Sequence, residues 1–216
     1  MKPLFKLALI IAPVVAAMGW SQSVSADTLR GDDLFDGAYV GFSIGAATAD
    51  GTTEYPLLAG GTRFAPFDPG TGQGYGTFAG YNFQRDNLIY GVELHYINMV
   101  RVADRNSAAQ EAREVIELVD LRGRVGYVNG NLMVYGALGY SWAKFRVHPG
   151  SGFGPRDNQT NLTGLNVGLG LEYAVNDSWL VGAEYTYRDL NGRFSEATRD
   201  TNLDVSNVSL RVIYKF

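Results

Sequence analysis

Large apolar residues recur at every second position in eight separate segments of this chain, and this feature constrains the fold most. The positions between them hold glycine, alanine, serine or charged residues, most clearly in residues 88–99, 163–175 and 179–190. A two-residue period is that of a β-strand whose two faces meet different environments. The sequence therefore predicts eight strands, at residues 37–49, 74–83, 88–99, 115–128, 132–146, 163–175, 179–190 and 204–216.

The polarity of the alternation indicates that the barrel lies in lipid. In residues 163–175, Leu165, Val167 and Leu169 share one face, opposite Asn166 and Glu172. A water-soluble barrel buries its large apolar side chains inside, but eight strands enclose too little space for all of them. We therefore expect the large apolar residues to face lipid and the small and charged residues to line the lumen.

The connections between the segments alternate in length. Residues 84–87, 129–131 and 176–178 are short and rich in turn residues. The remaining connections are longer, at 50–73, 100–114, 147–162 and 191–203. Short periplasmic turns and long extracellular loops are typical of transmembrane barrels. We therefore expect an all-β fold, an eight-stranded antiparallel up-and-down transmembrane β-barrel with four external loops.

The N-terminal residues have the pattern of an export signal. Lys2 and Lys6 precede an apolar run at 7–20, interrupted by Pro13, and small residues follow up to Ala26. This pattern predicts a signal peptide at 1–26, cleaved after Ala26; a membrane anchor or a buried helix is the alternative. Residues 27–36 are then a short, polar N-terminal lead, and residues 37–216 form the barrel.

The composition excludes several classes of site. The chain has 216 residues and no cysteine, which excludes disulfides, a thiol nucleophile and cysteine-bound metals. Signal cleavage removes two of the 18 basic residues and none of the 22 acidic ones, so the net charge falls from −4 to −6. Nucleic acid is therefore not an expected partner, since phosphate binding needs clustered positive charge.

Charged residues on the lumen face are expected to form ion pairs, because an unpaired buried charge is costly. Glu172 and Glu184 are the carboxylates most expected to pair, with Arg122, Arg124, Arg188 or Arg211 as partners. We interpret this network as a structural core and not a wide pore; a narrow or gated channel is the alternative. Its members are Glu93, Asp120, Arg122, Arg124, Glu172, Glu184, Arg188, Arg211 and Lys215.

Two histidines and one tyrosine need separate interpretation. His95 falls on the lumen face, where we expect a structural role, with a catalytic base or a pH sensor as alternatives. His148 falls in a predicted external loop. Most aromatic residues fall near strand ends and could form two interfacial girdles. Tyr39 is an exception, because alternation places it in the lumen.

The last strand carries a further signal. Leu210, Val212, Tyr214 and Phe216 share its apolar face, and the chain ends on Phe216. This ending resembles the C-terminal signal that the barrel-assembly machinery reads in bacterial outer-membrane barrels. Other local phrases are also similar to that class: Gly37–Gly41 (GAYVG), Phe78–Phe83 (FAGYNF), Val125–Tyr127 (VGY), Tyr135–Tyr140 (YGALGY) and Val212–Phe216 (VIYKF).

These phrases together resemble the small Gram-negative outer-membrane β-barrel family that includes opacity-type and Omp25/31-like porin-family surface proteins. The resemblance implies export through the general secretory pathway and a place in the bacterial outer membrane. It also implies, as partners, outer-membrane lipid and lipopolysaccharide, the assembly machinery during biogenesis, and a host or environmental ligand at the loops.

Three functions remain in competition. The first is a non-enzymatic surface protein that contributes to envelope structure and displays four loops. The second is a small porin that conducts solutes through the charged lumen. The third is an enzyme, which is disfavoured. The motif typical of lipid A deacylases of this barrel size is a histidine followed at short spacing by Ser-Asn. In this chain, Tyr96, Ile97 and Asn98 follow His95 instead. We expect no catalytic residue, no cofactor and no metal site.

Overall fold

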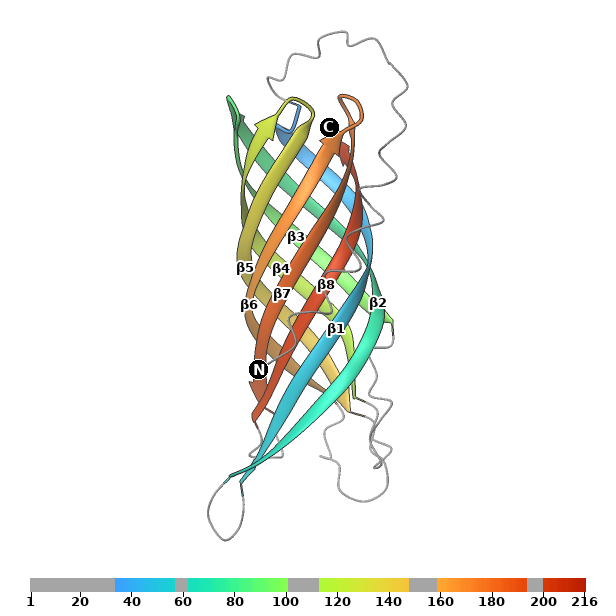
Figure 1. The fold of residues 1–216 in the computed structure, drawn as a ribbon, viewed down its shortest axis with the longest axis vertical. Coiled ribbons are helices and arrows are strands. Elements are labelled where there is room, and N and C mark those ends of the chain that lie inside the picture. The colour runs from blue at the N-terminus through green and yellow to red at the C-terminus, as the bar shows by residue number, and fades with distance from the viewer. Residues whose placement is uncertain (1–33, 57–61, 101–112, 148–158, 194–199) are drawn as a thin grey trace. The chain divides into compact units, whose positions relative to one another are not determined.

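The computed structural model describes residues 34–56, 62–100, 113–147, 159–193 and 200–216. They form eight antiparallel strands, each paired with the next in the chain, and β1 pairs with β8 to close a barrel (Figure 1). The predicted eight-stranded up-and-down barrel is confirmed. The strands are β1 (Gly37–Pro56), β2 (Thr62–Arg85), β3 (Leu88–Val100), β4 (Arg113–Asn129), β5 (Leu132–Val147), β6 (Gln159–Ala174), β7 (Trp179–Arg193) and β8 (Asp200–Lys215).

Three predictions from the sequence fall outside the described residues: the signal peptide at 1–26, most of the lead, and His148. Within the described part of the chain, no helix is long and apolar enough to cross a membrane.

The two ends of the barrel differ in their connections. Three short turns lie at one end, which we call the turn end and which is uppermost in Figure 1. Asp86 and Gly130 have φ of 54° and 59° there, as tight two-residue turns require. In the third turn, Asn176 Oδ1 accepts hydrogen bonds from the backbone of Ser178 and Trp179, at 3.0 and 2.9 Å. The opposite end, which the other connections join, is called the loop end.

The strands extend further at the loop end than the sequence predicted. β1 continues to Pro56 and β2 starts at Thr62, so most of the predicted connection at 50–73 is a paired hairpin. Pairing of β2 with β3 starts only at Gln73, and among the described residues 62–72 pair with β1 alone. An edge strand tolerates proline, so the prolines among residues 62–72 can lie in this part of β2.

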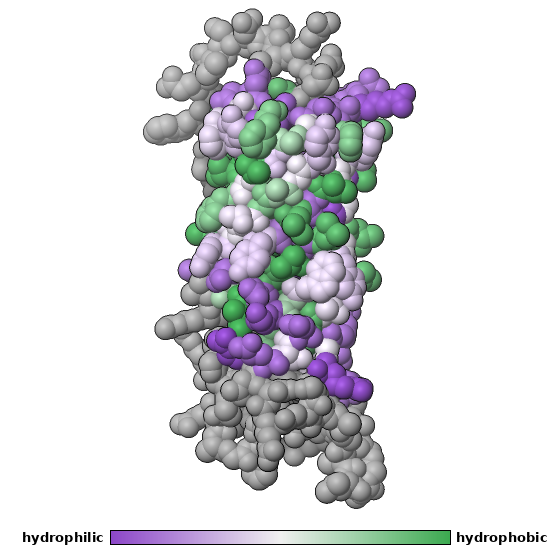
Figure 2. Space-filling view, turned by 180° about the vertical axis from the view of Figure 1, so that it is seen from behind, coloured by the Kyte–Doolittle hydropathy of each residue, from purple (hydrophilic) through white to green (hydrophobic). Residues whose placement is uncertain are grey.

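The outer surface of the barrel carries a broad apolar band. Leu138, Leu165 and Leu169 are each at least 64% exposed on it. Figure 2 shows hydrophobic side chains in the middle of one face and hydrophilic ones toward both ends. So large an exposed apolar surface is incompatible with water and fits the hydrocarbon of a bilayer.

Aromatic side chains gather on the outer surface near both limits of this band. At the turn end, the Tyr214 ring lies 5.1 Å from Trp179 and 5.3 Å from Phe216, between centroids. Toward the loop end, four tyrosine hydroxyls form hydrogen bonds with the neighbouring strand. The pairs are Tyr96–Glu117 (3.0 Å), Tyr140–Thr163 (3.0 Å), Tyr185–Ser206 (3.1 Å) and Tyr187–Asp204 (2.8 Å).

The lumen is divided into three tiers, whereas the sequence predicted small and charged residues throughout. A middle tier is polar, and an apolar tier lies at each end. The loop-end tier consists of Ala47, Ala49, Ile97, Met99, Val115, Leu118, Ala143, Phe145, Leu162, Leu190, Leu203 and Val205. The turn-end tier consists of Leu34, Phe35, Tyr39, Phe78, Ile89, Val128, Met133, Tyr135, Ala174, Leu180 and Ile213.

The prediction that all large apolar residues face lipid was therefore wrong at both ends of the lumen. At the loop end the strands pass beyond the apolar band, and polar residues such as Asn202 and Asp204 lie on the outer face. With water outside, the strands there can bury apolar side chains only inside, as a water-soluble barrel does.

Candidate functional site

The middle tier of the lumen is the candidate site, because it contains buried charges from five strands. Four carboxylates face four guanidinium groups, and none of these residues is more than 3% exposed. The strands supply Glu93 (β3), Asp120, Arg122 and Arg124 (β4), Glu172 (β6), Glu184 and Arg188 (β7), and Arg211 (β8).

Glu93 is the centre of the larger network. Its Oε1 accepts a hydrogen bond from Arg122 Nη2 at 2.6 Å, and its Oε2 accepts one from Arg124 Nη1 at 3.1 Å. Arg211 Nη2, from the other side of the lumen, also donates to Oε2. One carboxylate therefore joins three guanidinium groups from two strands.

Glu184 and Glu172 complete this network. Glu184 lies 2.8 Å from Arg122 Nη2 and 3.0 Å from Arg211 Nη1. Glu172 Oε1 lies 2.6 Å from Arg124 Nη2. The pairs that the sequence suggested for Glu172 and Glu184 occur with three of the four arginines. The fourth arginine, Arg188, pairs elsewhere.

Arg188 belongs to a second, smaller cluster. Its Nη2 donates to Asp120 Oδ2 at 2.6 Å, and its Nε lies 3.1 Å from Oδ1. Ser141 Oγ donates to the same carboxylate at 2.6 Å, and Asn166 Nδ2 donates to Ser141 Oγ at 2.8 Å. The lumen thus holds two separate neutral assemblies.

Tyr39 and Tyr135 are members of the network that the sequence analysis did not select. The Tyr39 hydroxyl donates to Glu93 Oε2 at 3.0 Å, and the Tyr135 hydroxyl donates to Glu184 Oε2 at 2.6 Å. A Cβ atom at Gly80 would clash with the Tyr39 ring and one at Gly170 with the Tyr135 ring, so glycine makes room for both rings. The alternation of inward and outward residues could have identified both tyrosines, because the residues next to each of them face lipid.

His95 lies in the lumen next to a serine. Its Nε2 is 2.9 Å from Ser43 Oγ, and the Phe78 ring packs edge-on against the imidazole at 5.3 Å. His95 Nδ1 is buried and has no hydrogen-bond partner. A nucleophile and base pair needs a third group that orients the histidine, and nothing occupies that role at Nδ1.

The remaining predicted residues lie outside the middle tier or on the outer surface. Lys215 is half-buried near the end of β8. The residues of the C-terminal signal all face outward, and Phe216 is 74% exposed. Among the described residues, no group of three or more histidine and acidic side chains could hold a metal ion.

The geometry of the middle tier suits a structural core more than a reaction centre. Each of the four guanidinium groups lies within 2.6–3.0 Å of at least one carboxylate or shares Glu93. Such pairs compensate the desolvation of the charges, and the removal of one partner leaves the others uncompensated.

Comparisons with known proteins agree with this architecture. The family profile described as the outer membrane protein beta-barrel domain matches residues 12–216. The 31 kDa outer-membrane immunogenic protein of Brucella melitensis is 27% identical over 250 residues, covering 96% of this chain and 99% of that protein. The 25 kDa outer-membrane immunogenic protein of Brucella abortus is 29% identical over 150 residues, covering 65% of this chain and 64% of that protein.

The crystal structure of neisserial surface protein A is similar with a TM-score of 0.50 and 20% sequence identity. The matched region covers 84% of this chain and 98% of the neisserial chain. At this identity the likeness shows the fold alone.

Proposed function

The chain belongs to the outer-membrane protein β-barrel family of Gram-negative bacteria, and on this premise we propose that it is a non-enzymatic surface protein. Its location is the bacterial outer membrane. Its closed barrel contributes to the structure of the envelope and holds the loop end at the cell surface. The turn end then lies in the periplasm, as in other barrels of this class.

One observation carries the proposal: charge-compensated ion pairs fill the lumen between two apolar tiers. A continuous water path would have to pass Leu118 and Phe145 at one end and Phe35 and Met133 at the other, all at most 1% exposed. It would also have to separate the arginines from Glu93. An eight-stranded barrel encloses a space that side chains can fill.

The loop end supplies the surface role. The strand ends that flank the connections at 57–61, 101–112, 148–158 and 194–199 lie there. The Brucella relatives are named immunogenic proteins, and by analogy we propose that these connections face the exterior. Their partners would be lipopolysaccharide and a host or environmental ligand, and the assembly machinery would bind the chain during biogenesis.

A small porin is the second candidate. The observation that favours it is the presence of polar atoms without hydrogen-bond partners in the middle tier, among them Arg188 Nη1 and Asn166 Oδ1. Buried atoms of this kind are frequent ligands of internal water. Against the porin stand the two apolar tiers, which separate these atoms from both mouths.

An enzymatic role is a weaker candidate. Ser43 and His95 have the spacing of a nucleophile and base, but both are buried, and Phe78 packs against the imidazole. Turnover of lipid A or phospholipid by the purified protein, lost in His95→Ala, would contradict the non-enzymatic proposal. We expect no turnover.

Single-channel recording tests the choice between the first two functions. The chain from residue 27 onward is refolded into lipid, and heat-sensitive gel mobility verifies the fold. We expect a silent membrane. Discrete, voltage-stable steps would establish the porin instead; Glu184→Gln should then change ion selectivity, whereas Glu117→Gln on the outer surface should not.

A further inference from the structure

We propose that residues 34–37, immediately before and at the start of β1, form a latch that closes the turn end of the lumen. The sequence predicted a short polar lead here, but the last part of that lead turns into the barrel. Leu34 is 5% exposed and Phe35 only 1% exposed. The latch is a device of the fold that does not depend on whether the barrel conducts.

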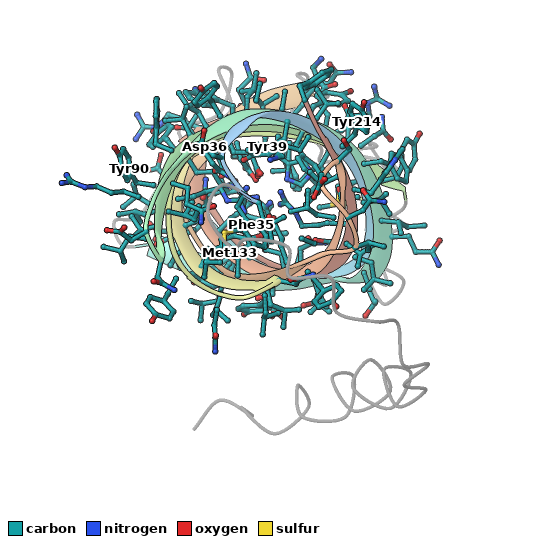
Figure 3. All side chains as sticks on the ribbon, turned by 90° about the horizontal axis from the view of Figure 1, so that it is seen from above. Phe35, Asp36, Tyr39, Tyr90, Met133 and Tyr214 are labelled. Carbon is teal, nitrogen blue, oxygen red and sulfur yellow. The ribbon has the colours of Figure 1, made fainter. Side chains whose placement is uncertain are left out.

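The Phe35 side chain enters the lumen from the turn end. Figure 3, viewed from that end, shows Phe35 and Met133 inside the ring of strands, and Tyr90 and Tyr214 outside it. Phe35 belongs to the turn-end tier together with Ile89 of β3 and Leu180 of β7. The side chain of a residue that precedes the first strand is thus enclosed by residues of several strands.

The latch is attached to β2 by three hydrogen bonds, two through its backbone and one through the Asp36 carboxylate. Phe35 N donates to Gln84 Oε1 at 3.1 Å, and Asn82 Nδ2 donates to Phe35 O at 3.2 Å. Gln84 N donates to Asp36 Oδ1 at 2.7 Å. These bonds give the segment a defined position before the β1–β2 ladder begins.

Gly37 supplies the change of direction between latch and wall. Its φ is +102°, a conformation that residues with a Cβ rarely adopt. The chain can therefore leave the lumen and enter β1 within one residue. Phe216 N bonds to Ala38 O at 3.0 Å beside this turn, so the latch lies where the first and last strands meet.

The latch shields the ion-pair network from water at the turn end. Tyr39 connects the two, because its ring belongs to the turn-end tier and its hydroxyl bonds to Glu93. A dry lumen strengthens the ion pairs, since their attraction falls as the local dielectric rises.

Thiol labelling tests the latch, because the chain has no cysteine of its own. Ala174→Cys places a thiol in the turn-end tier, and Ala143→Cys places a matched thiol in the loop-end tier; the two alanines are 0% and 2% exposed. Each is combined with Phe35→Ala in detergent micelles, where a water-soluble thiol reagent reaches both ends. Heat-sensitive gel mobility and strand circular dichroism verify folding.

We expect Phe35→Ala to accelerate labelling at position 174 by at least about tenfold and to leave position 143 unchanged, because local opening is confined to one tier. Phe83→Ala is the control for loss of an aromatic at the same end, since Phe83 faces outward with 48% exposure. Unchanged labelling at 174, or equal acceleration at both positions, would overturn the latch.

Gln84→Ala provides a second test if Phe35→Ala does not fold. This change removes the acceptor of the Phe35 N–H and leaves every apolar side chain of the turn-end tier in place. A smaller acceleration confined to position 174 is expected, and its absence would contradict the latch. Channel activity is scored separately, so failure of the latch and failure of the proposed function are distinguishable.

Discussion

The middle tier and the loop-end tier are built on the same strands with opposite polarity. In β8, Arg211 points into the lumen between outward-facing Leu210 and Val212. Closer to the loop end of the same strand, Leu203 and Val205 point inward and are at most 1% exposed. Every second residue of β8 points inward along both tiers, and only the polarity of these inward side chains changes.

At the loop end, this inversion follows the change of medium outside the barrel. Where lipid surrounds the wall, the outer face satisfies the hydrophobic effect and the lumen is free to hold ion pairs. Where water surrounds the wall, burial inside is the only way to remove apolar surface from water. At the loop end, the height at which the polarity inverts therefore indicates where the apolar band ends. At the turn end, Ile89 lies inside while its neighbours Leu88 and Tyr90 are exposed on the outer face.

The largest expected effect is the loss of the central carboxylate of the middle tier. Glu93→Gln leaves Arg122, Arg124 and Arg211 with one negative charge fewer, and removal of one partner of a buried pair costs about 3–5 kcal/mol. Urea unfolding in lipid vesicles measures the change. The control is Glu117→Gln, which breaks a half-exposed pair with Lys144 and should cost at most about 1 kcal/mol.

Charge balance is a sharper test of the same tier. The double variant Glu93→Gln/Arg211→Met restores a neutral lumen, so it should recover part of the stability that Glu93→Gln loses. A double variant less stable than the sum of both single changes would contradict the view that compensation of charge dominates.

The loop-end tier should respond to the loss of volume instead of charge. Leu203→Ala leaves a cavity among buried apolar side chains, which costs about 2–5 kcal/mol. Asn202→Ala, at the neighbouring outward position, should change stability by less than about 0.5 kcal/mol. Equal effects of the two changes in urea unfolding would show that no apolar core exists at this height.

A charge on the outer face should distinguish the two heights directly. Leu169 is 66% exposed in the apolar band, and Leu169→Arg should cost about 2–4 kcal/mol near the middle of the bilayer. Asn202→Arg, in the polar outer face near the loop end, should cost about 0–1 kcal/mol. Similar costs would mean that the band does not end where the polarity inverts.

The smallest effect concerns an exposed ion pair beyond the band. Arg193 Nε donates to Asp200 Oδ1 at 2.7 Å, and this hydrogen bond lowers the pKa of the Asp200 carboxyl. A carboxyl whose pKa is lower in the folded state stabilises the fold at pH values above its pKa in the unfolded chain. This contribution disappears as the pH falls through the pKa of the folded state. An NMR titration should show the Asp200 pKa rising in Arg193→Gln; an unchanged pKa would exclude the pair in solution.

Period-2 alternation predicted the strand number, their order and the class of fold, because pairing of neighbours in a closed barrel follows directly from chain order. The strand ends at the loop end were harder to predict from the sequence. Gly70 and Gly72 fall within the connection predicted at 50–73 but lie in the β1–β2 hairpin. Local turn propensity cannot reveal that a strand continues when a neighbour supplies its hydrogen bonds.

The charged lumen residues could be selected by parity, but their partners could not. Glu93 bonds to Arg211 over a separation of 118 residues, and Arg188 bonds to Asp120 over 68. These contacts cross the lumen, so they depend on strand tilt and on the heights at which the side chains meet. Tyr135 joins the network for the same reason.

The amino-acid sequence by itself determined which side chains face inward, since alternation along a strand is a property of the backbone. Only the tertiary structure decided which of those inward residues share a tier, that Glu93 lies at the centre of one network, and that Phe35 enters the turn end. The physical reason is that contacts such as Glu93–Arg211 and Arg188–Asp120 join strands that are not neighbours in the sheet, and the closed, tilted barrel brings those strands together across the lumen.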